Sequence, residues 1–213
     1  MPGSNAEVDS RMLTMQKKLI LASQSVQRRL LLETIGIPFE VLPADIDENA
    51  IIHDDPRQRA VLVATAKANT VYERLSDGDV GTQYLIIAAD TFGFKDGVFF
   101  EKPKDKAEAK RMLASLCEGP SVAITGFCSI DTQTGSTSSK CVETTMHFRP
   151  LSESEIEQYV SSNEVTMWSG GFSPAYHPGA ALIERIEGSL TSFSHGLPME
   201  LVVPALREAG ISL

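Results

Sequence analysis

The chain has 213 residues, of which 42% are hydrophobic and 22% are charged, a balance typical of a folded globular protein. Its 19 Lys and Arg residues stand against 28 Asp and Glu residues, which gives a formal net charge of −9. This acidity argues against duplex nucleic acid or an anionic membrane surface as the partner, because both attract clustered cations.

The cysteines and the hydropathy of the chain indicate its compartment. Cys117, Cys128 and Cys141 form no CxxC pair, which excludes a closed disulfide framework and a Cys-rich zinc site. No apolar run approaches the roughly 20 residues of a membrane span, and no signal-peptide core is present. We therefore expect a cytoplasmic protein. Residues 1–16 are polar and aperiodic, so we expect a disordered lead-in or tag remnant there, followed by one α/β domain over 17–213.

The first half of the expected domain alternates between strands and helices. An apolar run over 18–23 predicts a buried strand, and Ser25 then caps a helix over 26–34. A second strand is expected over 39–43, and a long helix begins at Pro56, directly after a capping Asp. The apolar stripe of that helix consists of Val61, Ala64, Ala68, Val71 and Leu75.

The second half begins with a strand over 84–89, whose lack of polar alternation indicates that both of its faces are covered. Capping-box patterns at Asp105 and Ser152 open two further helices. The other expected elements are strands over 122–130, 141–148 and 180–186 and a helix over 198–209, which Pro204 should kink or split. With neither a repeat nor a long linker, this order indicates an α/β fold with a mixed sheet flanked by helices.

The turn after the first strand carries Ser23, Ser25 and, in the first helical turn, Arg28 and Arg29. The positive end of a helix dipole attracts anions, so two arginines there are unfavourable unless an anion binds between them. The turn is therefore either a phosphate site with bidentate arginine contacts or a capped helix whose arginines are solvated.

Asp90 follows the apolar run over 84–89, at the edge where ligands bind in open α/β sheets. It is a candidate general base, a candidate Mg²⁺ ligand, or an ordinary Asp in a strand-end turn. A hairpin with its two-residue loop at 96–97 sets Lys102 opposite Thr91, or opposite Asp90 if the returning strand holds one bulge. Lys102 is otherwise a solvated lysine at the sheet edge.

Two more charges complete a candidate cluster. Glu48 follows the second strand, and Lys67 lies beside the apolar stripe of the long helix. Either one alone would be interpreted as a solvated charge. Together with Asp90 and Lys102 they form a set of two carboxylates and two lysines, which suits a polyphosphate bridged by Mg²⁺ better than an acyl or glycosyl substrate.

Several common motifs are absent. The chain has no P-loop, no GxGxxG after a strand and no GxSxG elbow. The four histidines are not spaced as helical metal ligands, and we expect structural or exposed roles for them. Only His195 is noted for its place beside Gly196.

In their order along the chain these residues resemble the Maf family of nucleoside triphosphate pyrophosphatases, relatives of the inosine triphosphate pyrophosphatase fold. The resemblance covers the chain from Lys18 onward and begins with Ser23-Gln-Ser25 and Arg28-Arg29. The matching segments that follow are Ile46-Asp-Glu48, Ala66-Lys67-Ala68, Ala89-Asp90-Thr91, Glu101-Lys102-Pro103, Thr125-Gly126, His147-Phe-Arg149, Ser169-Gly170 and Gly196-Leu-Pro198.

The resemblance implies a two-lobed fold with the active cleft between the lobes, dependence on Mg²⁺ or Mn²⁺, and release of pyrophosphate from a nucleoside triphosphate. Family members are often described as dimers, so it also implies a homodimer. Asp90 matches the proposed catalytic base, and Glu48, Lys67 and Lys102 match the other active-site charges. Glu48 and Asp90 are then the expected metal ligands, and the turn with Arg28 is the expected phosphate site.

Some substrate-binding positions depart from the family pattern. Val26 replaces the usual Pro, and Gln27 stands where Arg or a bulky aromatic residue is common. Thr91 resembles the branch that acts on dTTP and UTP, whereas the 7-methyl-GTP branch has Gln there. Ala175 stands where Gln or Glu is expected. We expect a pyrophosphatase for a pyrimidine or non-canonical nucleotide; the alternatives are a 7-methyl-GTP pyrophosphatase and a non-catalytic, nucleotide-binding regulator of cell division.

Overall fold

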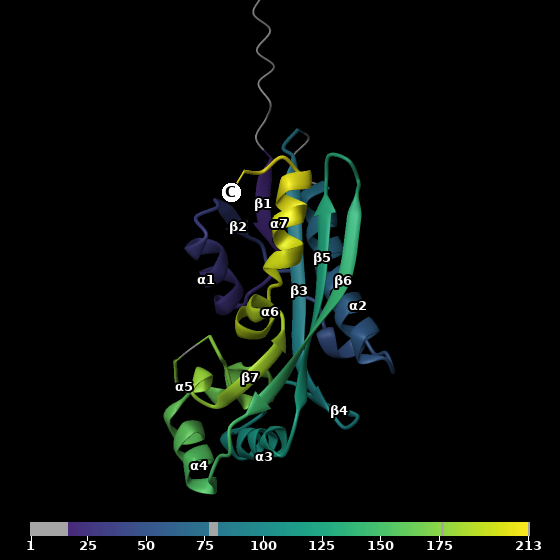
Figure 1. Ribbon diagram of the computed structural model, residues 1–213. Coiled ribbons are helices and arrows are strands. Elements are labelled where there is room, and N and C mark those ends of the chain that lie inside the picture. Colours follow the sequence, from purple (N-terminus) through teal and green to yellow (C-terminus); the bar gives the residue numbers. More distant parts are fainter. Residues whose placement is uncertain (1–16, 77–80, 176, 213) are drawn as a thin grey trace, which may run out of the picture.

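The computed structural model describes residues 17–76, 81–175 and 177–212. The lead-in expected over residues 1–16 lies outside the described residues. Within them, the backbone forms one mixed sheet of seven strands that runs along the length of the molecule (Figure 1). The strand order is β2-β1-β3-β5-β6-β7, and β4 pairs with β3 beside that path. The predicted mixed α/β fold is confirmed.

The parallel part of the sheet comes from the first half of the chain. It consists of β1 (Lys18–Leu21), β2 (Phe39–Val41) and the first part of β3 (Tyr84–Lys95). β1 ends opposite Ile87, whereas β3 continues to Lys95. The strand predicted over 84–89 is therefore too short, and Asp90 lies inside β3 instead of following its end. Asp90 nevertheless lies where β3 has just lost its parallel neighbour, so the sheet opens beside it.

The antiparallel part of the sheet comes from the second half. It consists of β4 (Val98–Phe100), β5 (Ser121–Asp131), β6 (Thr137–Phe148) and β7 (Ile183–Gly188). The strands predicted over 122–130 and 141–148 are confirmed with slightly longer bounds. The strand predicted over 180–186 begins later, because the chain first forms the short helix α5 (His177–Ala180).

The predicted hairpin between β3 and β4 is confirmed. Lys95 at the end of β3 pairs with Val98 at the start of β4, and the pairing ends with Gly93 opposite Phe100. Asp96 and Gly97 between the strands both adopt positive φ, as a tight two-residue turn requires. β4 ends at Phe100, so Lys102 lies beyond the strand ladder. The expectation that Lys102 pairs across the hairpin is therefore wrong.

Helices cover both faces of the sheet. The remaining ones are α1 (Val26–Thr34), α2 (Pro56–Ser76), α3 (Lys106–Cys117), α4 (Glu153–Ser162), α6 (Leu190–His195) and α7 (Met199–Glu208). Short 3-10 helices span Glu48–Ala50, Val165–Met167 and Ser169–Gly171. The N-caps at Ser25, Asp105 and Ser152 are confirmed, since each side chain accepts a backbone N–H. α7 continues through Pro204, so the predicted split is wrong. None of the described helices combines the length and apolarity that crossing a membrane requires.

The alternation of side chains along β3 determines which helix each of its residues meets. Ala89 belongs to a core with α1 and α7 on one face, and Ala88 belongs to a core with α2 on the other face. Side chains two residues apart on a strand lie on the same face of the sheet. Asp90 therefore lies on the α2 face with Ala88, and Thr91 lies on the α1 face with Ala89. The two residues at the opening of the sheet are thus supported from opposite faces.

A further core occupies the other end of the sheet, where α3 and α4 lie (Figure 1). It packs Leu113 of α3 and Tyr159 of α4 against Phe148 and Phe172. The rings of Phe148 and Phe172 meet edge to face at 5.0 Å. The molecule therefore has two lobes, one around α1, α2 and α7 and the other around α3 and α4, joined by the long strands.

Candidate active site

A cleft of about 1210 Å³ lies between the two lobes. Its walls come from the β1–α1 turn, the segment after β2, α2, the middle of β3, the residues after β4, and α6. Most of the predicted site residues line it: Ser23, Ser25, Gln27, Arg28, Glu48, Lys67, Asp90, Thr91 and Lys102. The fold therefore brings together predicted site residues that are up to 79 positions apart, from Ser23 to Lys102 (102 − 23 = 79).

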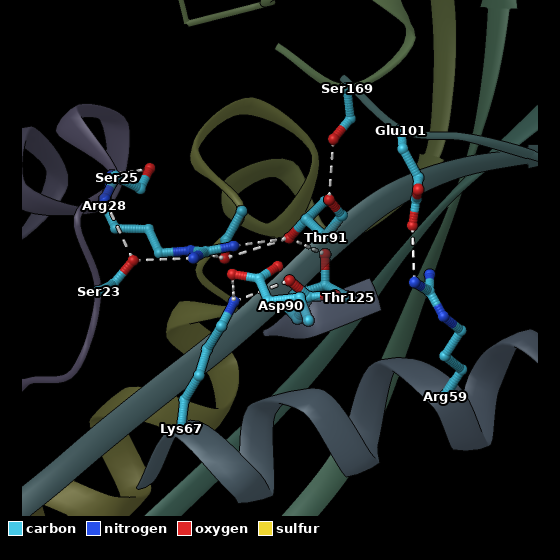
Figure 2. A network of polar contacts seen from close by, with 12 residues as sticks. Ser23, Ser25, Arg28, Arg59, Lys67, Asp90, Thr91, Glu101, Thr125 and Ser169 are labelled. Atoms are coloured by element: carbon cyan, nitrogen blue, oxygen red, sulfur yellow. Dashed lines mark hydrogen bonds and ion pairs between the residues drawn. The ribbon is translucent and has the colours of Figure 1, made fainter. Parts of the chain in front are cut away.

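Lys67 joins the two predicted carboxylates. Its Nζ lies 2.8 Å from Glu48 Oε1 and 2.9 Å from Asp90 Oδ1, and its side chain is only 9% exposed. Figure 2 shows the lysine rising from α2 to meet Asp90 on β3. A buried ammonium group requires such partners, because an unpaired charge in this position would lose its hydration without compensation.

Gly126 explains how α2 comes close enough for this contact. On β5 it stands directly opposite Asp90, and a Cβ atom added to it would lie 2.0 Å from the Ala60 carbonyl oxygen. Only a glycine therefore lets the backbone of α2 rest on the sheet at this point. Lys67, two helical turns after Ala60, then reaches the opening beside Asp90.

The pKa of Asp90 reflects opposing influences. Burial by itself would raise it, but the charges of Lys67 and Arg28 and hydrogen bonds with Lys67 and Glu48 outweigh burial. The pKa therefore lies below the ordinary value of 3.8, and the group is a carboxylate at neutral pH.

Arg28 forms the opposite wall of the cleft and is 7% exposed. Its Nε donates to the Gly196 carbonyl oxygen at 2.8 Å, Nη1 donates to Ser23 Oγ at 2.9 Å, and Nη2 donates to Thr91 Oγ1 at 3.2 Å. Burial lowers the pKa of Arg28 below its ordinary value, and the negative charges of Asp90 and Glu48 oppose this shift only in part. The guanidinium nevertheless stays charged at neutral pH. Each Nη atom keeps a second N–H for a ligand.

Thr91 links Arg28 to the rest of the sheet. Its Oγ1 lies 3.0 Å from Thr125 Oγ1 on β5, and its carbonyl oxygen accepts a hydrogen bond from Ser169 Oγ at 3.1 Å. Figure 2 shows this chain of contacts from Ser23 through Arg28 and Thr91 to Ser169. The threonine thus positions the arginine between the two lobes.

A family model described as Maf-like protein matches residues 18–209. The chain belongs to the Maf-like family. A protein of Geotalea uraniireducens named dTTP/UTP pyrophosphatase is 36% identical over 200 residues, 93% of this chain and 98% of the relative. One of Treponema denticola with the same name is 34% identical over 190 residues, 86% and 92% of the two chains. A nucleoside triphosphate pyrophosphatase of Synechococcus sp. is 34% identical over 193 residues, 89% and 96%.

Three predicted residues of this Maf-like chain have weaker links to the cleft. Lys102 lines it but is exposed and has no ion pair within the described part of the chain. Arg29 points away and pairs with Glu33 at 3.4 Å on the surface of α1. Ala175 is not among the lining residues, although Pro174 is. The structure therefore does not bring Arg29 and Ala175 to the cleft wall.

Sequence reasoning missed a second ion pair on the rim. Arg59 of α2 lies 2.7 Å from Glu101, which precedes Lys102 (Figure 2). The Nε of Arg59 also donates to the Ile51 carbonyl oxygen at 3.1 Å. The guanidinium also lies over two aromatic rings, 5.4 Å from the centroid of Phe92 and 5.3 Å from that of Phe99. No local pattern signals a pair that joins a helix to the end of a hairpin.

The carboxylates of the site fit a divalent cation that arrives with a substrate. Among the residues the structure describes, no three His, Cys, Asp or Glu side chains gather as metal ligands. Glu48 and Asp90 nevertheless lie beside each other at the cleft, because one oxygen of each carboxylate contacts Lys67 Nζ. Mg²⁺ commonly takes one or two protein carboxylates and completes its shell with water and phosphate oxygens. The donor set therefore suits a substrate-bridged ion.

Proposed function

We propose that this Maf-like protein hydrolyses nucleoside triphosphates to the monophosphate and pyrophosphate. One observation carries the proposal: a buried lysine holds two carboxylates opposite a buried arginine in a cleft that can hold a nucleotide. The curated relatives, named dTTP/UTP pyrophosphatase and nucleoside triphosphate pyrophosphatase, support the same reaction.

Asp90 is the proposed general base. It takes a proton from a water molecule whose oxygen attacks the α-phosphorus, and the bond from that phosphorus to the bridging α–β oxygen breaks. Pyrophosphate leaves with the electron pair of that bond. The lowered pKa keeps Asp90 ionised and able to accept the proton, while Lys67 holds the carboxylate in place through its 2.9 Å contact.

The cations of the cleft bind the phosphates in this proposal. Arg28 offers its remaining N–H groups, and its hydrogen bonds to Ser23 and Thr91 hold the guanidinium in one orientation. Ser25 and Gln27 lie in the same turn, where the N-terminus of α1 favours an anion. Lys102 is free to move toward the bound triphosphate, because no ion pair within the described residues restrains it.

Mg²⁺ or Mn²⁺ is the proposed cofactor, with Glu48 and Asp90 as its protein ligands. A bound ion of this kind would neutralise phosphate charge and orient the triphosphate. Glu48 suits this role because its side chain is half exposed at the cleft and faces Asp90 across Lys67.

The proposed substrates are dTTP and UTP, in line with the names of most of the relatives given above. The test is a panel of dTTP, UTP, CTP and 7-methyl-GTP with Mg²⁺, in which the released product is identified as pyrophosphate or phosphate. We expect pyrophosphate from dTTP and UTP. Turnover of 7-methyl-GTP alone would assign the chain to the other branch, and binding without any product would favour a regulatory protein.

The role of Asp90 is tested in the same assay with Asp90→Asn, which keeps the shape of the side chain but cannot accept the proton. We expect a loss of kcat of about 10³-fold. The matched control is Glu33→Gln, which removes a carboxylate on α1 outside the cleft. A wild-type rate for Asp90→Asn would show that Asp90 is not the base.

A further inference from the structure

His195, the last residue of α6, lines the cleft and has no role in the mechanism above. The next residue, Gly196, ends the helix with φ of 66°. A Cβ atom on Gly196 would lie 2.9 Å from Thr91 Oγ1 and 3.2 Å from Arg28 Nη2. His195 therefore stands one residue from the point where Arg28 meets Thr91, at the wall of the proposed substrate site.

The hydrogen bonds of Ser194 assign the tautomer of this histidine. Ser194 Oγ lies 2.8 Å from the Leu190 carbonyl oxygen and 2.7 Å from His195 Nδ1. A carbonyl oxygen can only accept, so the single hydroxyl proton is donated to Leu190. Both short contacts are then satisfied only if His195 Nδ1 carries a proton and donates it to Ser194 Oγ.

The other ring nitrogen, Nε2, is consequently a hydrogen-bond acceptor in the neutral ring. Burial lowers the pKa of His195, which keeps the ring neutral at physiological pH. Within the ranges that the structure describes, Nε2 has no hydrogen-bond partner. Among the residues that line the cleft, His195 therefore offers a hydrogen-bond acceptor with a fixed tautomer, one residue before Gly196, whose carbonyl oxygen Arg28 contacts.

We propose that His195 Nε2 accepts a hydrogen bond from the nucleoside part of the substrate. The proposal rests on the proposed function. Phosphate oxygens are themselves acceptors at neutral pH and would be repelled by the lone pair of Nε2. The partner must carry an N–H or O–H group, which a nucleotide has at the imide N3–H of uracil or thymine and at the ribose hydroxyls.

A contact to the base would also determine specificity. Uracil and thymine carry a hydrogen on N3, whereas N3 of cytosine is itself an acceptor. A fixed acceptor facing that position favours dTTP and UTP over CTP, because a cytosine would leave two lone pairs opposed and both groups unpaired.

The experiment compares wild type with His195→Phe, which keeps a ring but removes both nitrogens. The substrates are UTP, N3-methyl-UTP and 2′,3′-dideoxy-UTP, and kcat and KM are measured from pyrophosphate release. We expect the variant to lose roughly 5- to 10-fold in kcat/KM for UTP, the value of one neutral hydrogen bond. The loss should vanish for the analogue that lacks the contacting hydrogen: N3-methyl-UTP if the base is the donor, dideoxy-UTP if the ribose is.

Two variants separate a lost hydrogen bond from a damaged helix. His195→Gln places an amide oxygen near the position of Nε2 and should recover most of the UTP activity. Ser194→Ala removes the acceptor for Nδ1–H, so the tautomer is no longer fixed, and we expect a smaller loss that again depends on the analogue. An equal loss for all three substrates, or no loss for UTP, would overturn the proposal.

Failure of the proposed function gives a different result. If wild type releases no pyrophosphate from any substrate, the function is wrong, and the His195 contact is then measured by calorimetric binding of the same three nucleotides. The same dependence on the analogue is expected in the dissociation constants, and equal affinities of wild type and His195→Phe for UTP would overturn the contact.

Discussion

Arg28 and Arg29 are adjacent in the first turn of α1, and their surroundings are opposite. Arg28 shares the buried face of the helix with Leu32, four residues later, and makes three hydrogen bonds across the cleft wall. Arg29 shares the exposed face with Glu33 and pairs with it at 3.4 Å. Helical geometry separates neighbouring side chains by about 100°, so one arginine belongs to the site and the other to the surface.

The two lysines of the site differ in the same sense. Lys67 is held between two carboxylates and is almost fully buried, whereas Lys102 is exposed on the segment after β4. A held cation keeps its orientation when the cleft is empty, and an exposed one must lose side-chain entropy when it binds. We therefore expect substitutions at the held cations to have the larger effects on catalysis.

The largest effect is expected for Lys67→Met, which keeps the length of the side chain and removes its charge. Glu48 and Asp90 are then left without their shared counter-ion, and the pKa of Asp90 rises because a charge that lowers it is gone. We expect kcat/KM to fall by about 10³-fold and the acid limb of its pH profile to move upward. An unchanged acid limb would show that Lys67 does not control the ionisation of Asp90.

Arg28→Lys and Arg29→Lys form a matched pair of variants. Lysine keeps the charge at both positions but cannot reproduce the guanidinium contacts with Gly196, Ser23 and Thr91. We expect Arg28→Lys to lower kcat/KM roughly 100-fold and Arg29→Lys to change it by less than about twofold. Equal losses for both variants in the turnover assay would remove the distinction between the two arginines.

Lys102→Ala should have a smaller effect of a different kind. An exposed lysine that binds phosphate contributes similarly in the ground state and in the transition state, so its loss raises KM more than it lowers kcat. We expect KM to rise roughly 10-fold while kcat changes by less than about threefold. A large loss of kcat at saturating substrate would place Lys102 among the catalytic groups.

The smallest effect is expected in the pH dependence of the free energy of unfolding. The pKa of Asp90 in the folded protein lies below its ordinary value of 3.8, so the ionised group stabilises the fold above that value. This contribution is lost as the pH falls from about 3.8 through the folded pKa. Urea unfolding of wild type and Asp90→Asn between pH 3 and 7 should give free energies that converge toward the acid end; parallel curves would contradict the shift.

Much of the fold could be predicted from local patterns. The capping residues Ser25, Asp105 and Ser152 each begin a helix where expected, because a cap is a contact within one turn. The bounds of β3 could not be predicted in this way. Its polar residues Asp90 and Thr91 break the apolar run, but the strand continues because β5 pairs with it as far as Phe94.

The site divides along similar lines. Glu48, Lys67 and Asp90 were predicted as site residues from their charges and from a family resemblance. The family match confirms that resemblance. The pairing of Arg59 with Glu101 was not, since it joins a helix to a hairpin end 42 positions later (101 − 59 = 42). The fixed tautomer of His195 was equally out of reach, because it depends on where the Ser194 hydroxyl proton goes.

The sequence by itself determined the family, the order of elements and the kinds of charge available, because these depend on composition, periodicity and short motifs. Only the tertiary structure decided which charges act together. In the sequence, Arg28 cannot be distinguished from Arg29, nor Lys67 from Lys102. The fold distinguishes them, because the sheet opens beside Asp90 and Gly126 lets α2 approach the sheet there. Burial and contact over long separations distinguish them, and neither is a property of a residue or its neighbours in the chain.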